Sequence, residues 1–160
     1  MRTYRFVLYA AVMCCAIASP RAQADRDRDK DRCERDCLVA ISEQYLNALA
    51  AKDPKKAPLA GSTIKNTENG QRLHVGDGLW NSITARGTYK LHVADATYGQ
   101  IVTFTTMREA GTPLILAVRL KVEKRQITEI ETLVAHSEGG AKNLETMGQP
   151  HAAFERDTPA

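Results

Sequence analysis

Four segments with the pattern of β-strands follow one another in the second half of the chain, and they limit the possible fold more than any other feature. Their residues alternate between apolar and polar or are continuously apolar. Only short turns separate them, so each segment can pair with the next as an antiparallel meander. The segments are residues 88–95, 100–109, 113–123 and 126–135.

One amphipathic helix is expected ahead of these strands. Apolar residues fall at spacings of three and four, which form a single stripe on a helix; they are Leu38, Ile41, Tyr45, Leu46 and Leu49. The stripe ends at Asp53-Pro54, where proline disfavours helical geometry in the residue before it. A helix followed by a curved antiparallel sheet predicts the α+β class, with the helix covering one face of the sheet.

Residues 1–24 have the three-part layout of a secretory signal peptide. Two arginines precede an apolar run from Phe6 to Ala18, and Ala22-Gln23-Ala24 matches a cleavage site. The run is shorter than the ~20 residues that cross a bilayer as a helix. We therefore expect cleavage after Ala24 and a secreted or periplasmic protein that has no membrane attachment once the signal is removed. Acylation of Cys14 is a weaker alternative, because Val12-Met13 precedes it in place of a small residue.

The charge balance gives no indication of a nucleic-acid partner. The chain has 22 Lys and Arg against 19 Asp and Glu, but three arginines and no acidic residue lie in the predicted signal. The remaining charges are balanced, and a balanced domain lacks the basic surface that nucleic acids require. Residues 25–32 (DRDRDKDR) contain no apolar side chain and are expected to form a solvated arm.

Export also decides how the cysteines are interpreted. Cys33 and Cys37 remain after cleavage, in an oxidising compartment, so a local disulfide is expected. Residues four apart on a helix have β-carbons ~5–6 Å apart, wider than the ~3.8 Å of a disulfide, so the first helical turn would have to be loosened. Two thiolates make only half a zinc site and His74 is far along the chain, so neither a metal nor a cofactor is predicted.

Turn residues are densest in the segment TENGQRLHVGDGLW at 67–80. Asn69-Gly70 and Asp77-Gly78 are tight-turn signals, which predict a short hairpin or loop beside a helical turn. Trp80 is a candidate pocket wall, with His74 or Asp77 at the pocket mouth and Glu68 and Asn69 as further ligand contacts. The alternative is that Asn69 and the glycines satisfy turn geometry while Trp80 covers the core.

The blocks YLNALAAKDPKKAPLA, TENGQRLHVGDGLW, GTYKLHVAD and LAVRLKVEKRQITEIETLVA resemble an uncharacterised, often secreted domain family, over roughly residues 33–150. That family is similar to the SnoaL-like, nuclear transport factor 2-like cone domains, which include ketosteroid isomerases, polyketide cyclases, dehydratases and modules that only bind or dimerise. The resemblance implies a cone-shaped domain with an apolar pocket at residues 33–136. After His136 the chain is polar and rich in glycine, which predicts a loose tail at 137–160. Members usually carry an acidic residue and glycine where Lys124-Arg125 stand here, and such a two-residue turn requires positive φ.

Two glutamates in the last predicted strand are the best catalytic candidates. Counting back from a turn at Lys124-Arg125 places Glu131 opposite Val118 and Glu129 opposite Leu120, on the same apolar face. A carboxyl group there would have a raised pKa and could act as a general acid or base. The alternative is that both glutamates lie at the exposed end of the sheet or pair with a base such as Arg119 or Lys121, because a register slip of one residue reverses every side chain.

Three functions remain open on this evidence. The first is binding of a small organic molecule, with Arg119 as a further contact and the hydroxyl of Tyr89 as a hydrogen-bond donor. The second is cofactor-free acid-base catalysis of the isomerase, dehydratase or cyclase type, with Glu131 or Asp77 as the base. The third is a dimerisation or assembly module without catalysis, which would make the protein a homodimer.

Overall fold

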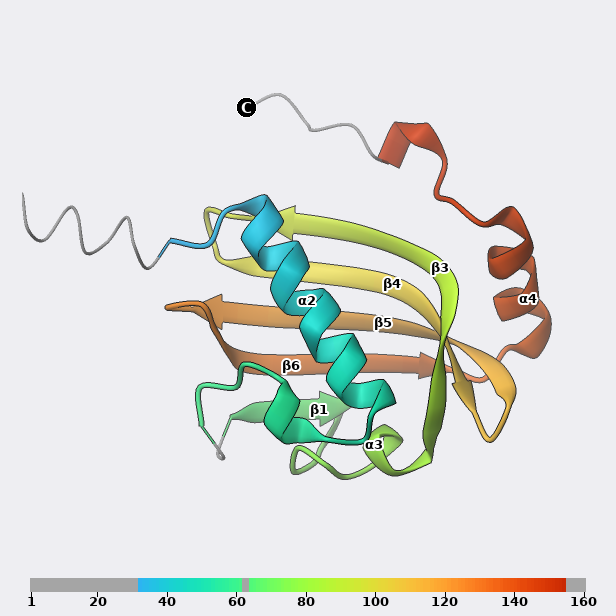
Figure 1. The fold of residues 1–160 in the computed structure, drawn as a ribbon, viewed down its shortest axis with the longest axis horizontal. Helices are drawn as coiled ribbons and strands as arrows, with labels where there is room; N and C mark the ends of the chain where they lie inside the picture. Colours follow the sequence, from blue (N-terminus) through green and yellow to red (C-terminus); the bar gives the residue numbers. More distant parts are fainter. Residues whose placement is uncertain (1–31, 62–63, 155–160) are drawn as a thin grey trace, which may run out of the picture. The chain divides into compact units, whose positions relative to one another are not determined.

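Six strands form a single curved sheet in the order β2-β1-β6-β5-β4-β3 (Figure 1). The structure is a computed structural model that describes residues 32–61 and 64–154. The predicted signal peptide and all of the predicted charged arm except Arg32 lie outside the described residues. The strands are β1 (Lys65–Glu68), β2 (Gln71–Arg72), β3 (Ile83–Asp95), β4 (Gln100–Glu109), β5 (Thr112–Glu123) and β6 (Gln126–Ala135). The four predicted strands are confirmed, although β3 begins earlier than its alternating pattern suggested.

The helix α2 (Arg35–Ala50) lies across one face of the sheet, as the apolar stripe predicts (Figure 1). All five stripe residues are buried in the core, and Leu38 and Leu46 have no exposed surface. They pack on the side chains of β5 that alternate inward, namely Leu114, Leu116, Val118, Leu120 and Val122. We call this α2-covered side the inner face of the sheet and the opposite side the outer face.

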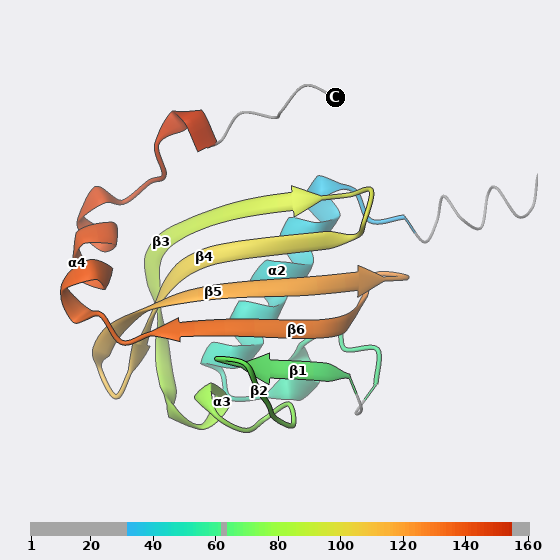
Figure 2. The same cartoon turned by 180° about the vertical axis from the view of Figure 1, so that it is seen from behind.

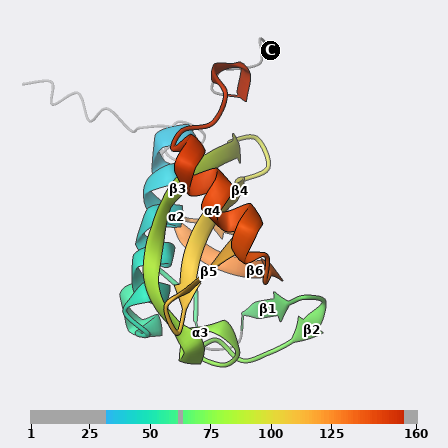
Figure 3. The same ribbon diagram turned by 90° about the vertical axis from the view of Figure 1, so that its right-hand side faces the viewer.

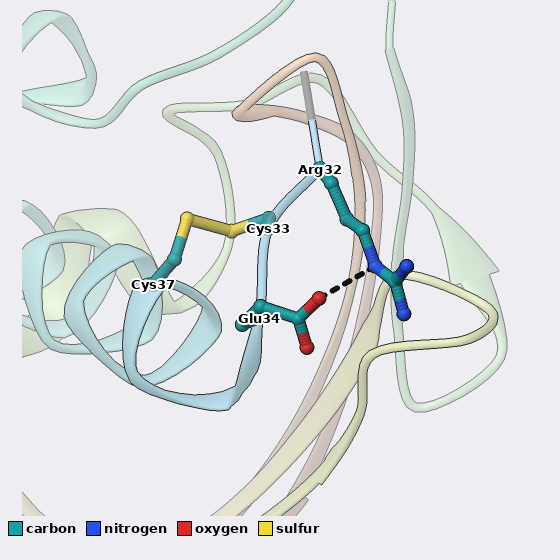
Figure 4. The surroundings of a disulfide bond; sticks show 4 residues. All are labelled: Arg32, Cys33, Glu34 and Cys37. Atoms are coloured by element: carbon teal, nitrogen blue, oxygen red, sulfur yellow. Dashed lines mark ion pairs between the residues drawn. A yellow bond between two sulfur atoms is a disulfide. The ribbon is translucent and has the colours of Figure 1, made fainter. Parts of the chain in front are cut away.

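A disulfide joins Cys33 to Cys37 at the start of α2 (Figure 4). Cys33 precedes the first helical residue, Arg35, and only Cys37 lies within the helix. The bridge is as the sequence predicted, but it needs no loosened helical turn, because Cys33 lies before the helix and the first turn is closed by a hydrogen bond from Leu38 N–H to the carbonyl of Glu34. At the other end of the helix, Asp53 accepts a hydrogen bond from the backbone N–H of Lys55 and begins the short 3₁₀ helix η1 (Pro54–Lys56).

The turn-rich segment forms the predicted hairpin between β1 and β2, followed by the helical turn α3 (Leu79–Ser82). Asn69 and Gly70 have φ values of 47° and 81°, the left-handed geometry that a tight hairpin turn needs. β1 also pairs in parallel with β6, from Lys65 opposite Glu129 to Glu68 opposite Thr132. This parallel pairing, which the meander did not predict, adds the hairpin to the β6 edge of the sheet.

The pairing of β5 with β6 differs from the predicted register by one residue. The turn pairs Glu123 with Gln126 as expected, but a bulge follows, and Lys121 then pairs with Glu129. Thr128 is the extra residue, and its hydroxyl donates to the carbonyl of Lys121. An extra residue in one strand moves all later side chains to the opposite face. Glu129 and Glu131 therefore project from the outer face, where Glu131 pairs with Arg119 rather than Val118.

The segment after His136 forms a helix, α4 (Glu138–Met147), where the sequence predicted a loose tail. It packs against the end of the outer face, with Glu145 bound to Arg108 at 2.8 Å and Gly140 beside Ile115. Figures 2 and 3 show α4 at one end of the sheet, and a short 3₁₀ helix, η2 (Ala152–Phe154), follows it. None of the helices in residues 32–61 and 64–154 is both long and apolar enough to cross a membrane.

Candidate functional site

Five side chains with polar atoms meet inside the cone, where the end of α2 faces the hairpin. We call them the inner polar cluster: Tyr45, Asn66, Glu68, Trp80 and Thr132. Tyr45 comes from α2, Trp80 from α3 and the other three from β1 and β6. Two of the predicted ligand contacts, Glu68 and Trp80, are thus brought together, whereas the turn signals in the sequence gave no indication that Thr132 is their neighbour.

Tyr45 is the centre of this cluster. Its hydroxyl is hydrogen-bonded to the side chains of Thr132 and Trp80, and because an indole N–H can only donate, Tyr45 accepts from Trp80. The two rings pack edge to face with centroids 5.6 Å apart. Burial raises the pKa of Tyr45 far above its usual range, and the nearby charge of Glu68 raises it further. The hydroxyl therefore stays protonated and holds α2 to the end of the sheet.

The carboxylate of Glu68 binds the backbone at the start of α3. Its Oε2 accepts a hydrogen bond of 2.9 Å from the backbone N–H of Leu79, the first residue of α3. A β-carbon on Gly78 would lie only 2.8 Å from both carboxylate oxygens, and Gly78 also has a positive φ of 62°. Glycine at this position therefore serves both the turn and the close approach of the carboxylate.

The space between these side chains is already occupied by the protein. The gap that they form with Leu49 and Leu79 is too narrow at every point to admit a water molecule. The apolar pocket that the family resemblance implied inside the cone is thus filled by the protein's own side chains. A ligand could enter there only if the hairpin or α3 moved.

An open groove lies instead along η1, beside the loop that follows β2. We call it the η1 groove; its volume is about 460 Å³ and its lining residues are Pro54, Lys55, Ala57, Leu59, Gly61 and Val75. Leu59 is held in place by a parallel bridge to Ile127 of β6. The Lys55 side chain forms no ion pair within the described part of the chain, whereas the ammonium of Lys56 lies 3.9 Å from Asp53. The groove is therefore mainly apolar, with one unpaired cation at its edge.

The other predicted contacts in the turn-rich block do not gather around Trp80. Asn69 bonds through its side-chain amide to both backbone groups of Val134, at 2.8 and 3.3 Å, and so extends the ladder of β6. His74 and Asp77 are exposed and do not line the inner cavity. For Asn69 the structural interpretation is correct, because its side-chain amide pairs with the backbone of Val134 as a residue of a neighbouring strand would.

Glu129 and Glu131 do not lie on the apolar face. Arg119 donates from Nε to Glu131 at 2.9 Å and from Nη2 to Glu129 at 3.0 Å, and its Nη1 donates to Gln100 at 3.2 Å. The hydrogen bond from Arg119 lowers the pKa of Glu129, opposite to the raised pKa expected for a carboxyl group in the cone. The proposed catalytic pair is therefore wrong in position, and the alternative of pairing with Arg119 holds.

Tyr89 lies in the irregular stretch of β3, where the register with β4 shifts between Arg86 and Lys90. It is buried, and its carbonyl accepts a hydrogen bond of 2.7 Å from the hydroxyl of Thr105. It lines neither the inner cavity nor the η1 groove. Its predicted role as a ligand contact has no support from this geometry.

A second polar network, not predicted from the sequence, joins α2 to β3 and β4. Thr103 hydrogen-bonds to Ser42 at 2.7 Å and to Nδ1 of His92 at 2.9 Å. His92 Nε2 lies 3.2 Å from Glu43, although not in hydrogen-bond geometry, and Arg86 binds Glu43 through two donors. Burial raises the pKa of Glu43, but its hydrogen bond with Arg86 and the charge of Arg86 outweigh that and lower it.

This network resembles a nucleophile chain, but its burial excludes that role in the folded state. Ser42 and Thr103 are completely buried, so no substrate can reach either hydroxyl. Burial lowers the pKa of His92, so its imidazole is neutral at pH 7. The network fixes the helix on the sheet. The sequence signal that could have found it is the polar face of α2, where Ser42 and Glu43 interrupt the apolar stripe.

The described residues contain no group of three or more His, Cys, Asp or Glu side chains placed to hold a metal ion. The two cysteines near the start of α2 are joined to each other, so neither is a free thiolate ligand.

The chain is similar in sequence to one protein family and in fold to several solved structures. One family, described as a domain of unknown function (DUF8021), matches residues 31–134. No curated protein matches the sequence. A solved structure of a putative ketosteroid isomerase from Kribbella flavida DSM 17836 is similar in fold, with 11% identity and a TM-score of 0.50 over 78% of this chain and 92% of that one.

Two further solved structures match with lower scores. An LEH-like epoxide hydrolase from M. tuberculosis has 16% identity and a TM-score of 0.49, over 70% of this chain and 91% of that one. An NTF2-like protein from Burkholderia xenovorans LB400 has 14% identity and a TM-score of 0.48, over 72% of this chain and 98% of that one. At these identities the likeness concerns the fold and not the chemistry.

Proposed function

Starting from the fact that the chain belongs to the DUF8021 family and has an NTF2-like fold, we propose that it binds a small organic molecule in the η1 groove. The observation that carries this proposal is the groove itself. Its volume of about 460 Å³ lies within the ~300–1,000 Å³ typical of ligand sites, and most of its lining is apolar. The inner cavity, in contrast, has no space for a ligand without a rearrangement.

The charge at the edge of the groove defines the class of molecule. Lys55 is the one charged residue in the lining of the groove, and it forms no salt bridge with any carboxylate in the described segments. A ligand with an apolar body and one carboxylate satisfies both features, because the body is removed from water while the anion meets Lys55. We therefore propose an organic acid of moderate size, and octanoate is a suitable probe.

Isothermal titration calorimetry with four probes tests this assignment. Octanoate binds more tightly than octanol, octanamide or octylamine if Lys55 contacts the carboxylate. Lys55→Gln weakens octanoate by about threefold to fivefold, the range of an exposed ion pair, and leaves octanol unchanged. Lys56→Gln is the matched control and has no effect. Val75→Trp fills the groove and weakens all four probes.

The outcome separates the two parts of the proposal. Equal affinity for octanoate and octylamine would reject the role of Lys55 but keep the groove. Binding of every probe that is unaffected by Val75→Trp would reject the groove as the site.

Cofactor-free acid-base catalysis is a second candidate, and one observation favours it. The carboxylate of Glu68 lies near enough to Tyr45 for its charge to raise the pKa of that hydroxyl, so a potential base and a hydrogen-bond donor stand side by side. Because the cavity is closed, catalysis requires that the hairpin or α3 opens. The amide oxygen of Glu68→Gln can still accept the hydrogen bond from the backbone N–H of Leu79. The variant therefore removes the potential base and keeps the contact with the start of α3.

A β,γ-unsaturated ketone is the appropriate substrate probe for this second candidate. Its isomerisation, followed by ultraviolet absorbance, is lost in Glu68→Gln while thermal stability is retained. Isomerisation that is equal in the two proteins, or absent from both, would remove the catalytic candidate.

We also propose that the protein is exported, on the layout of residues 1–24. Mass spectrometry of protein recovered from outside the cytoplasm tests this directly. A mature chain that begins at Asp25 is expected, and an intact chain retained in the cytoplasm would contradict export.

A further inference from the structure

A further open pocket lies at the corner of the sheet where β6 ends, and we call it the corner pocket. β4 and β5 stay paired as far as Glu109 and Thr112, whereas the pairing of β6 with β5 ends at Ala135 and Ile115. The chain leaves the sheet at His136 and continues into α4 (Figure 2). The volume of the corner pocket is about 190 Å³, and its lining residues are Glu109, Thr112, Pro113, Leu114, His136 and Glu138.

The corner pocket is separate from the sites described above, because it shares no lining residue with the η1 groove or the inner polar cluster. Two of its lining residues, Pro113 and Leu114, are apolar and buried, and the other four have polar side chains. Its volume is well above the ~10–15 Å³ that one water molecule needs. Water and a small organic molecule can therefore enter together.

The imidazole of His136 is held by the carboxylate of Glu109. Nε2 of His136 lies 2.7 Å from Oε2 of Glu109 in hydrogen-bond geometry. Hydrogen bonding to the hydroxyl of Ser82 and to His136 lowers the pKa of Glu109, so this carboxylate is ionised at neutral pH. Because an ionised carboxylate can only accept a hydrogen bond, Nε2 carries the proton and donates it.

The other ring nitrogen of His136, Nδ1, is then the basic atom of the neutral imidazole. It forms no hydrogen bond with residues 32–61 or 64–154, and the side chain is 66% exposed, so water reaches it. A carboxylate that fixes one imidazole nitrogen and leaves the other free to take a proton is the arrangement of a general base. No hydrogen bond in the described structure joins His136 to the hydroxyl of Thr112, so water is the nucleophile that this base can activate.

The charges of the lining determine which substrates can enter. Glu109 and Glu138 line the corner pocket, whereas no Lys or Arg of the described residues does. Lys142 binds Glu138 at 2.6 Å and so balances one of the two carboxylates. A substrate with a carboxylate of its own would be repelled by Glu109, because like charges placed together are unfavourable. The pocket therefore favours small uncharged molecules.

We propose that the corner pocket hydrolyses small uncharged esters, with His136 as the base that activates water and Glu109 as the residue that positions its imidazole. Nδ1 removes a proton from the water molecule while the water oxygen attacks the carbonyl carbon of the ester. The tetrahedral intermediate then breaks its bond to the alcohol oxygen, which takes the proton from the imidazolium. A carboxylic acid and an alcohol are formed, and His136 returns to its neutral form.

Hydrolysis of p-nitrophenyl acetate, followed by the absorbance of the released p-nitrophenol, tests this site. The rate of the wild type saturates with substrate, exceeds that of imidazole at the same concentration, and is lower in D₂O because a proton moves in the transition state. His136→Gln lowers kcat/KM by about 100-fold, the lower end of what a general base contributes, because the imidazole is largely exposed. His74→Gln is the matched control and changes nothing, since His74 is also exposed but has no carboxylate partner among the described residues.

Two further variants and a second substrate test the positioning residue and the pocket. Glu109→Gln lowers kcat by at least about tenfold and leaves KM unchanged, because an amide can donate as well as accept and no longer fixes the proton on Nε2. Thr112→Trp fills the corner pocket and raises KM. The wild type hydrolyses p-nitrophenyl hydrogen succinate, which carries a carboxylate, at least about tenfold more slowly than the acetate.

Folding of the variants is checked independently by thermal melting, which His136→Gln leaves unchanged because the side chain lies at the surface. A wild type no faster than imidazole, or equal rates in His136→Gln and His74→Gln, would overturn the proposal. Equal rates in H₂O and D₂O would show that Nδ1 attacks the ester directly, which rejects the activation of water. An unchanged kcat in Glu109→Gln would reject the positioning of the imidazole by this carboxylate.

Discussion

The β5–β6 turn is built from two residues that are poorly suited to it. Lys124 and Arg125 have φ values of 50° and 62°, in the left-handed region that two-residue hairpin turns require. Asparagine tolerates this region better than lysine, and glycine adopts it without strain. We therefore expect the double variant Lys124→Asn and Arg125→Gly to be more stable than the wild type.

The magnitude follows from two opposing effects. An ordinary side chain in the left-handed region costs about 1–2 kcal/mol, so removing the strain at Arg125 and reducing it at Lys124 stabilises the fold by about 2 kcal/mol. Glycine in place of arginine gives the unfolded chain more conformational freedom, which offsets about 0.5–1 kcal/mol. The net gain is about 1 kcal/mol, or about 3–5 °C in melting temperature for a domain of this size.

Urea denaturation followed by tryptophan fluorescence measures this gain. Lys124→Gln is the control, because it removes the charge, keeps the β-carbon and changes stability by less than about 0.5 kcal/mol. A double variant less stable than the wild type would show that the turn does not adopt left-handed geometry. The register of β5 and β6 described above would then be in question as well.

Three further results are expected. Arg119→Met raises the pKa of Glu129 toward its usual value, as seen by NMR of the carboxyl carbon. Because the pKa is lowered in the folded protein, the stability that it provides is present above the usual pKa of about 4.5 and lost as pH falls, so the variant differs from wild type at neutral pH and converges with it in acid. Tyr45→Phe leaves two buried partners unpaired and costs about 1–3 kcal/mol in urea denaturation. Gly87→Ala places a β-carbon against the hydroxyl of Thr106 in β4 and the carboxylate of Glu145 in α4, and lowers stability by about 1–3 kcal/mol in the same assay.

Each of these three has a matched control. Lys142→Met removes a cation far from Glu129 and leaves that pKa unchanged. Tyr98→Phe removes the hydroxyl of a tyrosine that is 66% exposed and leaves stability unchanged. Gly139→Ala adds a β-carbon with no atom within 4 Å, inside a helix, and raises stability slightly. A variant that behaved like its control would refute the contact on which its prediction rests.

The regular elements were predictable because their patterns are local. The apolar stripe of α2 and the alternation in β4 and β5 depend only on which side of one element faces the core. Turn chemistry identified the hairpin at Asn69-Gly70 for the same reason. The pairing of β1 with β6 was not predictable, because strands distant in sequence carry no local signal of their partner.

The predicted face of Glu129 and Glu131 was wrong because of a single inserted residue in β6. Thr128 carries no feature that marks it as a bulge, since threonine is also common in regular strands. The bulge becomes visible only when both strands are aligned, and it reverses the face of every later side chain of β6. The same slip explains why the alternative, pairing with Arg119, was the better interpretation.

The helix α4 was not predicted, because it is stabilised by tertiary contacts and not by a local sequence pattern. Gly139 and Gly140 lower its helix propensity, and Ala141 is its one fully buried residue in the described structure. The ion pair of Glu145 with Arg108 connects it to the sheet. The inner polar cluster was missed in part for a similar reason, since Tyr45 and Thr132 are far apart in sequence and meet only in the folded cone.

Intermolecular NOEs between octanoate and the methyl groups of the protein test the proposed binding site most directly. The account predicts contacts from the octanoate chain to Leu59 and Val75, and none to Leu79 beside the inner polar cluster or to Leu133 on the outer face. Contacts to Leu79 or Leu133 without contacts to Leu59 and Val75 would contradict the assignment of the η1 groove.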